Sequence, residues 1–261
     1  MRIVVTRPSP QAEAWVGRLQ ARGLDAVALP LLAIEDGPDP AAVERARERL
    51  DRFAWIVFVS PTAVARFLGA GGERAPWPAA GEGRAAAPGA GTAEALRAAG
   101  VPPERTVAPD AARGRFDAES LWDAICAGGV PDLPGRRVLV VRGTEGRDWL
   151  GERFADAGAT VETVAAYRRV DAALDPDGRE RLAAALAAPD RHAWLVASGS
   201  AVDALRRAIG PRRDTDPLAV ATAIATHPRI AERARAAGFG RVRVASEGFE
   251  AVVRCIESAE P

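Results

Sequence analysis

The chain has 261 residues, enough for two domains of about 130 residues that each bury a core of their own. Basic and acidic residues balance at 35 each, so no global field would recruit nucleic acid or an anionic membrane. The absence of lysine excludes a P-loop lysine and a Schiff-base lysine, and the only histidines, His192 and His227, fit neither a Ser/His/Asp set nor an HExxH pattern.

The first half of the chain predicts an open α/β unit with parallel strands. Arg2–Arg7 has the apolar run of a buried strand, and Pro8-Ser9-Pro10 separates it from a helix that Gly23 ends. The next strand, at 25–34, completes a βαβ unit. Further along we expect a helix from Asp39-Pro40 to Leu50, a strand at 54–59, helices at 63–68, 93–99 and 118–127, and a short strand at 106–108. The stretch Gly69–Pro88, rich in Gly, Ala and Pro, is expected to be an exposed loop.

The second half, after the break at Gly128–Gly135, repeats the pattern of the first. The matching pairs are Arg137–Arg142 with Arg2–Arg7, Trp149 with Trp15, Gly158 with Gly23, and Ala193–Val202 with Ala54–Val64. We therefore predict a tandem duplication of one open α/β unit.

Polar and glycine residues recur where strands of this pattern end. In an open parallel sheet, ligands bind beyond the carboxyl ends of the strands, where helix N-termini present free N–H groups and a partial positive charge. The candidate binding residues in this position are Arg7, Ser60, Thr62, Gly89, Thr92, Arg142, Gly143, Ser198, Ser200, Thr226 and Arg229. Each segment alone is explained as a helix N-cap. Together, in two facing domains, they predict a binding cleft for a ligand with several carboxylates or phosphates.

Tyr167 is the only tyrosine of the chain and lies in the stretch Thr160–Asp171, which closes one half of the repeat. If the chain crosses between two domains here, Tyr167 stands at the mouth of the cleft. The alternative is a tyrosine that ends a strand by packing its ring and exposing its hydroxyl to water, which is common. Position alone favours this alternative.

The apolar run at Met1–Arg7 is too short for a signal peptide, and no later apolar run reaches the length of a membrane span. We therefore expect a cytoplasmic protein that has no membrane partner. Cys126 and Cys255 lie far apart in the sequence without metal-ligand spacing, so we expect reduced cysteines, no disulfide and no metal site.

A series of short motifs follows the order of one known family along nearly the whole chain. The motifs are VTRP at 5–8, FVSPTAV at 58–64, PGAGTAEALRAAG at 88–100, VVRGTEGRDWL at 140–150, TVAAYRRV at 163–170 and ASGSAVDAL at 197–205. With these motifs the chain resembles the uroporphyrinogen-III synthase family, which closes linear hydroxymethylbilane into a macrocycle and inverts its last pyrrole ring. No single motif is specific, but the ordered set is.

The resemblance implies two similar open parallel-sheet domains of the flavodoxin-like, HemD-type fold, joined by a two-stranded linker. One domain would hold residues 1–35 with 170–261, and the other residues 36–167, with crossovers near 32–37 and 164–170. This map replaces the tandem split near Pro131 that the repeat alone suggests. It places Tyr167 at a crossover, facing the cleft.

The resemblance also implies the chemistry. Tyr167 would donate a hydrogen bond near the leaving hydroxyl of hydroxymethylbilane, and the candidate binding residues would hold acetate and propionate groups so that the bilane folds toward uroporphyrinogen III. The family needs no cofactor and no metal for this reaction. We expect a monomer without a nucleic-acid partner.

Two segments depart from the family pattern. Ser198-Gly199-Ser200 stands where the family often has Ser-Pro-Ser, and His227-Pro228-Arg229-Ile230 stands where it has a Gly-Pro-Thr-Thr-like turn. The second departure removes a hydroxyl that usually lines the cleft. Thr226 could replace it, or Arg229 could bind a propionate directly, and the sequence leaves both open.

Two other classes of protein share features of this pattern. A non-catalytic tetrapyrrole-binding or sensor module would carry an appended winged helix, which we do not expect because the sequence ends at Pro261 without one. A two-domain exported receptor would carry a signal peptide. The sequence therefore favours the enzyme over both.

Overall fold

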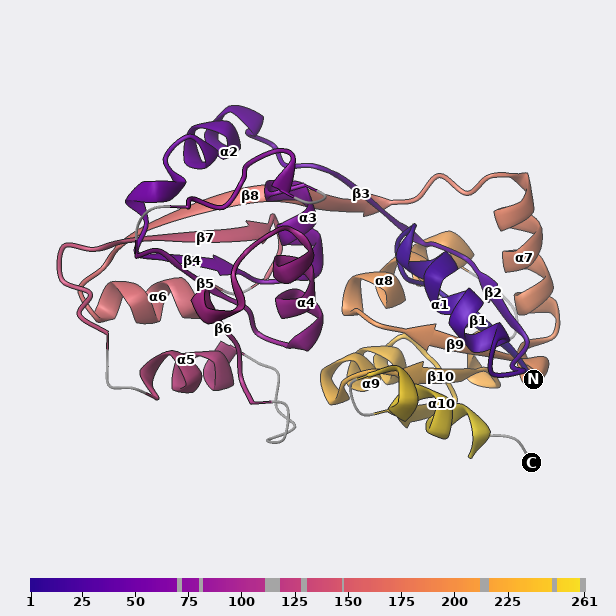
Figure 1. Ribbon diagram of the computed structural model, residues 1–261. Coiled ribbons are helices and arrows are strands. Elements are labelled where there is room, and N and C mark those ends of the chain that lie inside the picture. Colours follow the sequence, from indigo (N-terminus) through magenta and orange to yellow (C-terminus); the bar gives the residue numbers. More distant parts are fainter. Residues whose placement is uncertain are drawn as a thin grey trace. The chain divides into compact units, whose positions relative to one another are not determined.

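The computed structural model describes residues 1–69, 72–79, 82–110, 118–127, 131–146, 148–211, 216–245 and 248–258. Its contacts divide the chain into two compact units: Met1–Ile34 with Val170–Pro261 form unit 1, and Glu35–Arg169 form unit 2. The chain passes from one unit to the other within β3 (Leu32–Asp36) and again within β8 (Thr160–Asp171). These two strands are neighbours in one sheet, as Figure 1 shows.

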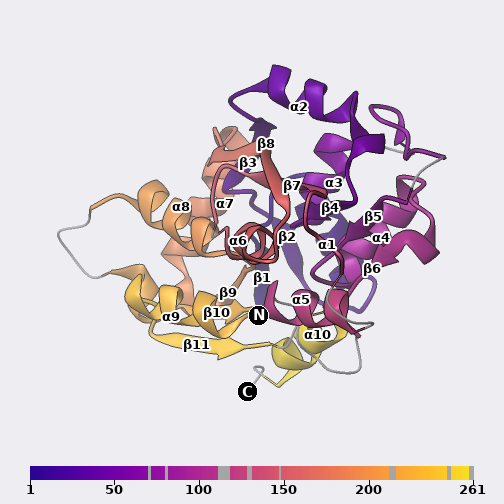
Figure 2. The same ribbon diagram turned by 90° about the vertical axis from the view of Figure 1, so that its left-hand side faces the viewer.

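Unit 1 is built on a five-stranded sheet with the strand order β11-β10-β9-β1-β2. The strands are β1 (Arg2–Val5), β2 (Ala26–Ala28), β9 (His192–Val196), β10 (Thr222–Ala225) and β11 (Arg241–Val244). Each neighbouring pair is parallel, and β11 forms one edge of the sheet (Figure 2). The central strands are almost fully buried, which explains their unbroken apolar runs.

Within the described residues of unit 1, five helices cover the two faces of this sheet. They are α1 (Gln11–Gln20), α7 (Pro176–Ala187), α8 (Gly199–Ile209), α9 (Pro228–Ala236) and α10 (Phe249–Glu257). Because successive strand residues point to opposite faces, Val4 and Trp194 pack against α7, α8 and α9, whereas Ile3 and Leu195 pack against α1 and α10. Unit 1 therefore has a core on each face of its sheet.

Unit 2 is built on a six-stranded sheet with the order β3-β8-β7-β4-β5-β6. Its remaining strands are β4 (Trp55–Phe58), β5 (Arg84–Ala86), β6 (Thr106–Val107) and β7 (Arg137–Gly143). The pairs β4 with β5, β4 with β7, β5 with β6 and β7 with β8 are parallel. The parallel strand pairs of the two sheets confirm the predicted α/β fold class.

The helices of unit 2 are α2 (Pro40–Arg47), α3 (Pro61–Phe67), α4 (Ala90–Ala98), α5 (Ala118–Cys126) and α6 (Trp149–Asp156). Short 3-10 turns lie at Leu50–Arg52 and Pro103–Arg105 in this unit, and at Pro189–Arg191 and Pro217–Ala219 in unit 1. In Figure 1, α5 and α6 run side by side, and Leu121 and Phe154 from these helices pack on the same face of the sheet as Val140. On β4, Phe58 instead contacts Phe67 of α3, with ring centroids 5.9 Å apart.

The internal repeat is visible in the strand order. The order β11-β10-β9-β1-β2 of unit 1 corresponds to β6-β5-β4-β7-β8 of unit 2, so that β9 matches β4 and β1 matches β7. The sequence pairs 193–202 with 54–64 and 137–142 with 2–7 therefore occupy equivalent places in the two sheets. In unit 1, the βαβ unit β1-α1-β2 from the first half of the chain shares a sheet with β9, β10 and β11 from the second half. In unit 2, the βαβ unit β7-α6-β8 from the second half shares a sheet with β4, β5 and β6 from the first half.

Two predictions about single elements are wrong. The stretch Gly69–Pro88, predicted to be an exposed loop, contains β5, and Ala85, Ala86 and Ala87 are completely buried. The alanines fit there because β5 lies between β4 and β6 with helices on the sheet, where small side chains fill the available space. The single strand predicted at 25–34 is two strands, β2 and β3, which belong to different sheets; Pro30 lies between them and lacks the N–H that a continuous strand would use.

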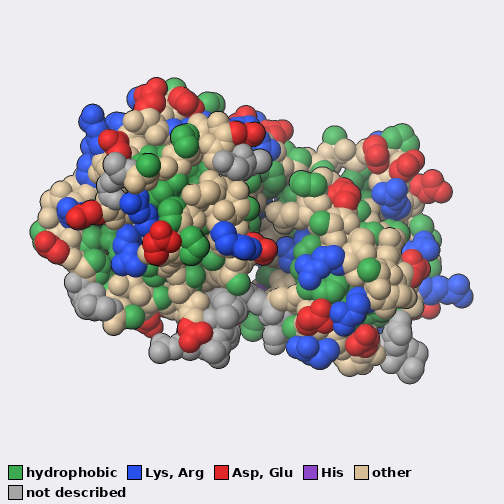
Figure 3. All heavy atoms as spheres, viewed as in Figure 1, with side chains coloured by type: hydrophobic (Ala, Val, Ile, Leu, Met, Phe, Trp, Pro, Cys, Tyr) green, Lys and Arg blue, Asp and Glu red, His purple; other side chains and the backbone are tan. Residues whose placement is uncertain are grey.

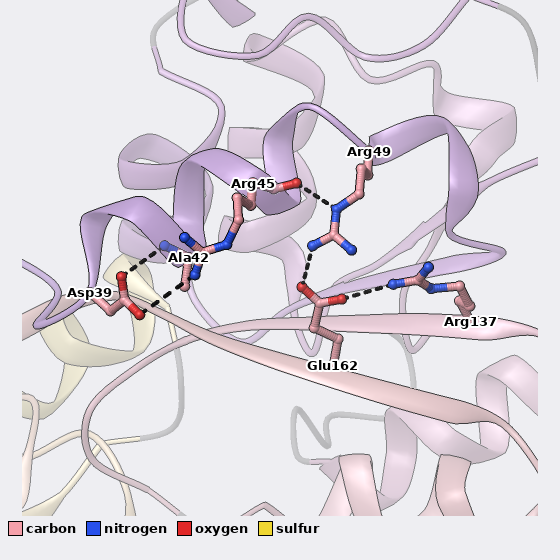
Figure 4. Close-up of polar contacts among 6 residues, drawn as sticks. All are labelled: Asp39, Ala42, Arg45, Arg49, Arg137 and Glu162. Carbon is pink, nitrogen blue, oxygen red and sulfur yellow. Dashed lines mark hydrogen bonds and ion pairs between the residues drawn. The ribbon is translucent and has the colours of Figure 1, made fainter.

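Glu162 on β8 ties α2 and the turn after it to the sheet of unit 2 (Figure 4). Its two carboxylate oxygens accept from Arg49 at 2.9 Å and from Arg137 at 3.1 Å. The Arg49 Nε also donates to the carbonyl of Arg45, 2.8 Å away. At the start of α2, the Asp39 carboxylate accepts from the Ala42 N–H at 2.9 Å, as the predicted N-cap requires.

The face in Figure 3 carries basic and acidic side chains interspersed, in keeping with the balanced charge. Among the described residues, no helix is long and apolar enough to cross a membrane. Cys126 on α5 and Cys255 on α10 are both free thiols, and burial raises the pKa of each.

Candidate functional site

The parallel pairing of unit 2 gathers several predicted residues at one edge of its sheet. Because β4, β5, β7 and β8 are parallel neighbours, their carboxyl ends meet at the same edge. Ser60 follows β4, Gly89 follows β5, Gly143 ends β7 and Tyr167 lies near the end of β8. We call this edge the rim of unit 2.

The side chain of Tyr167 is only 2 % exposed, and its hydroxyl points at Ser60. The two hydroxyl oxygens are 3.1 Å apart, and either could donate. Ser60 is also the N-cap of α3, and its oxygen accepts from the Ala63 N–H at 3.1 Å. The helix start therefore fixes the position of the oxygen that Tyr167 meets. Position in the sequence alone favours a tyrosine that exposes its hydroxyl to water. The burial of Tyr167 does not support that alternative.

Arg169 lies two residues further along β8, on the same face of the strand as Tyr167. Its Nη2 donates to the Tyr167 hydroxyl at 3.3 Å, and its guanidinium carbon is 5.3 Å from the centroid of the tyrosine ring. The hydroxyl is thus flanked by a neutral hydroxyl and by a cation.

Gly143 makes room for the tyrosine ring. The β7–β8 pairing shifts register between Arg142 and Gly143, so Arg142 lies opposite Ala165 and Gly143 opposite Tyr167. The Tyr167 carbonyl accepts from the Thr144 N–H at 3.1 Å. A Cβ on Gly143 would lie 2.8 Å from two ring carbons of Tyr167, which no side chain could tolerate without displacing the ring.

Arg142, predicted to bind an anion, is held by its own loop. The guanidinium donates to the carbonyls of Gly143, at 3.3 Å, and of Gly146, and it lies 3.5 Å from the Asp148 carboxylate. The side chain is only 12 % exposed. In this state, Arg142 shapes the loop that follows β7.

The other predicted residues of unit 2 belong to α3 and α4. Thr62 lies in the first turn of α3 and is half-buried. Gly89 is the N-cap residue of α4 and makes no side-chain cap, so the first amides of this helix are not satisfied by a capping side chain. Thr92 in the first turn of α4 is buried, at 4 % exposed. This helix start offers N–H donors to an anion.

The remaining predicted residues, Arg7, Ser198, Ser200, Thr226 and Arg229, belong to unit 1. Ser198 caps α8 by accepting from the Ala201 N–H at 3.1 Å, which repeats the role of Ser60. Thr226 is half-buried after β10, Ser200 is half-buried in the first turn of α8, and Arg229 is exposed in the first turn of α9.

His227 takes the N-cap position of α9. Its Nδ1 accepts from the Arg229 N–H at 3.1 Å, which requires that this nitrogen be unprotonated. The imidazole thus serves the helix start. This assignment leaves the Thr226 hydroxyl and the Arg229 guanidinium as the polar groups that could meet a ligand here.

Arg7 at the end of β1 stacks on Trp15, with its guanidinium carbon 4.4 Å from the ring centroid. Its Nε is buried and has no hydrogen-bond partner among the described residues. Burial lowers the pKa of this guanidinium. Next to it, the Thr6 hydroxyl donates to the Leu195 carbonyl at 2.9 Å and ties β1 to β9.

The structure thus brings Ser60, Gly143 and Tyr167 into contact, and it adds Arg169, which the sequence reasoning missed. The signal for Arg169 was present in the sequence, because residues i and i+2 of a strand share a face. Within the described part of the chain, no group of three His, Cys, Asp or Glu side chains could hold a metal ion.

The family model described as "Uroporphyrinogen-III synthase HemD" matches residues 13–251. The chain belongs to this family. A uroporphyrinogen-III synthase of Salmonella typhimurium is 33% identical over 171 residues, a match that covers 65% of this chain and 65% of that protein. The match therefore spans slightly less than two thirds of the length of the Salmonella protein.

Solved structures of the HemD family share the fold at low sequence identity. A mutant uroporphyrinogen III synthase of Thermus thermophilus is 19% identical, with a TM-score of 0.57 over 99% of this chain and 98% of that chain. The enzyme from Helicobacter pylori is 16% identical, with a TM-score of 0.54 over the whole of both chains. At this identity, the two structures support the fold alone.

Proposed function

We propose that the protein is a uroporphyrinogen-III synthase, which closes hydroxymethylbilane into uroporphyrinogen III with loss of water and inversion of the last pyrrole ring. The observation that carries the proposal is the Tyr167 hydroxyl on the rim of unit 2, which hydrogen-bonds Ser60 and Arg169. Membership of the HemD family supports the choice of reaction.

The first step needs a proton donor for the departing hydroxyl. The bond between the hydroxymethyl carbon and its oxygen breaks, both electrons go to the oxygen, and a proton from Tyr167 completes a water molecule. The carbon is left as the electrophilic end of an azafulvene system. Tyr167 is the only tyrosine of the chain, and no lysine is present to compete for this role.

The second task is orientation of the bilane. The electrophile must meet the substituted carbon of the last ring, whereas the unguided reaction closes at the unsubstituted position. Holding acetate and propionate groups at several points supplies this restriction. Donors that fit carboxylates include the first amides of α4 after Gly89, the hydroxyls of Thr62, Thr92, Ser198, Ser200 and Thr226, and the cations Arg7 and Arg229.

The isomer ratio tests the proposal directly. Hydroxymethylbilane is incubated with and without the protein, and the uroporphyrinogens are oxidised and separated as their type I and type III porphyrins. We expect mainly type III with the protein and type I without it. The same ratio in both reactions would show that the protein is not this enzyme.

We further propose that the protein acts as a monomer in the cytoplasm. Free thiols on α5 and α10 fit a reducing compartment. Sedimentation equilibrium should give the mass of one chain at assay concentrations, and a mass of two chains would contradict the monomer.

A further inference from the structure

Two neighbouring arginines on β8 have different surroundings. Arg168 points to one face of the strand and pairs with Glu35, with 2.7 Å between its Nη2 and the carboxylate. Arg169 points to the opposite face and reaches Tyr167. Among the described residues, no carboxylate lies within ion-pair distance of Arg169. Its nearest polar partner is a hydroxyl that the proposed reaction would convert to an anion.

The donors and acceptors around the Tyr167 hydroxyl can be assigned. A guanidinium has donors and no acceptor, so the Tyr167 oxygen accepts from Arg169. The Ser60 oxygen already accepts from the Ala63 N–H, which leaves its own proton free to point at Tyr167. With two donors aimed at its oxygen, Tyr167 can direct its proton toward a third group.

We propose that Arg169 is a positioning residue that directs the Tyr167 proton outward and holds the phenolate that remains after proton transfer. This inference rests on the proposed function. When Tyr167 gives its proton to the leaving oxygen, water departs and the phenolate keeps one negative charge. At that moment the hydrogen bond from Arg169 joins a cation to an anion instead of to a neutral hydroxyl, so it becomes stronger. The proton that the last ring loses after closure returns to the phenolate, so the cycle releases only water.

Kinetics of three variants test this role. R169Q keeps a donor of similar length but removes the charge, R169K keeps the charge without the planar fork, and R168Q is the matched control on the other face of β8. We expect R169Q to lower kcat by about 10- to 100-fold, because the side chain that orients the reacting hydroxyl is lost. KM should change by less than about 2-fold, because Arg169 does not bind the substrate in this proposal. R169K should recover part of kcat, and R168Q should match the parent.

A substrate carboxylate bound by Arg169 would give a different result. In that case, R169Q would raise KM and leave kcat near the parental value. That outcome, or equal kcat for R169Q and R168Q, would overturn the proposal.

A second measurement needs no substrate. Because Tyr167 is the only tyrosine, a sample labelled with carbon-13 at the tyrosine Cζ gives a single NMR signal from this residue. The position of that signal depends on the hydrogen bonds to the hydroxyl, so R169Q, which removes the contact from the guanidinium, should shift it, whereas R168Q should leave it at the parental position. R169K should fall between them, and circular dichroism verifies that each variant is folded.

The two measurements separate the two hypotheses. If the parent protein yields no type III isomer, the proposed function fails, yet the NMR signal still reports whether Arg169 donates a hydrogen bond to the Tyr167 hydroxyl. If the parent is active but R169Q matches R168Q in both the NMR signal and kcat, the function stands and the role of Arg169 is wrong.

Discussion

The hydroxyl oxygens of Ser60 and Tyr167 lie 3.1 Å apart although 107 positions separate the two residues in the sequence. Ser60 follows β4 and Tyr167 lies on β8, and β7 runs between these strands in the sheet. The serine is fixed by its role as the N-cap of α3. The contact therefore links the start of a helix to the hydroxyl that we propose as the proton donor.

Tyr167→Phe should lower kcat by about 100-fold or more, the usual contribution of a general acid, because only the hydroxyl is lost. The ring still fills the space beside Gly143, so the fold should persist with a stability loss of about 1 kcal/mol for the missing hydrogen bonds. Turnover to the type III isomer and the thermal midpoint are the measurements. Type III product at the parental rate would remove Tyr167 from the mechanism.

Thr92→Ala should reduce turnover less than Tyr167→Phe does. Thr92 lies in the first turn of α4, where the backbone N–H groups after Gly89 remain to bind a carboxylate when the hydroxyl is gone. Steady-state assays of both variants under the same conditions make the comparison. A larger loss for Thr92→Ala would reverse this ranking and make its hydroxyl the more important group.

Gly143→Ala should impair turnover through Tyr167. The new methyl group would lie 2.8 Å from the tyrosine ring, so the ring and its hydroxyl must move, at a cost of about 1–3 kcal/mol in stability. Gly17→Ala on α1 is the control, because its Cβ would meet no atom within 4 Å. Both variants are assayed for kcat and thermal midpoint. Parental kcat in Gly143→Ala would mean that the exact place of the hydroxyl is unimportant.

The sequence predicted most elements because their patterns are local. Strand β8 begins and ends at the bounds of the stretch Thr160–Asp171 on which the sequence analysis placed Tyr167. Asp39 and Ser60 cap their helices because a short polar side chain before a helix can accept from its first N–H groups. β5 was missed because Arg84–Ala86 has no β-branched or aromatic residue, and only its place between two strands makes it a strand.

The site was predicted as separate segments rather than as contacts. The sequence gives Ser60 and Tyr167 as candidates, but their contact depends on the strand order β8-β7-β4, which is tertiary information. The contacts of Arg142 also depend on tertiary structure. Its place at the end of a strand suggested an anion site, but its guanidinium is occupied by two carbonyls of its own loop and by Asp148. The role of Gly143 depends on a register shift that no local pattern reports.

Glu162→Gln should destabilise unit 2 without altering the chemistry. The carboxylate serves Arg49 and Arg137 together and is only 30 % exposed. The amide has one accepting oxygen instead of two and no charge, so one arginine loses its acceptor and both lose their ion pair. We expect a loss of about 1 kcal/mol, or roughly 2–4 °C in Tm. Glu82→Gln, which breaks a pair with Arg136 on a side chain that is 87 % exposed, is the control and should change Tm by much less. Equal shifts would show that the bridging position of Glu162 adds nothing.

The ion pair between Asp171 and Arg207 should make a small, pH-dependent contribution to stability. Both Arg207 nitrogens that face Asp171 lie 2.6 Å from its oxygens, and these hydrogen bonds hold the pKa of the carboxyl below its usual value. A depressed folded-state pKa stabilises the fold above the unfolded value of about 3.9, and this stabilisation is lost as the pH falls through the folded-state value. Both side chains are at least half exposed, so the gain is below about 1 kcal/mol.

Asp171→Asn reveals this contribution by difference. Urea unfolding of the parent and the variant should differ by a constant, small free energy from about pH 5 to pH 7, and the difference should shrink toward zero as the pH falls below about 4. Added salt at pH 7 should also reduce it, because the pair is exposed. A difference that grew on acidification would mean that folding raises the pKa of Asp171 instead of lowering it, and it would contradict the stabilising role of the ion pair.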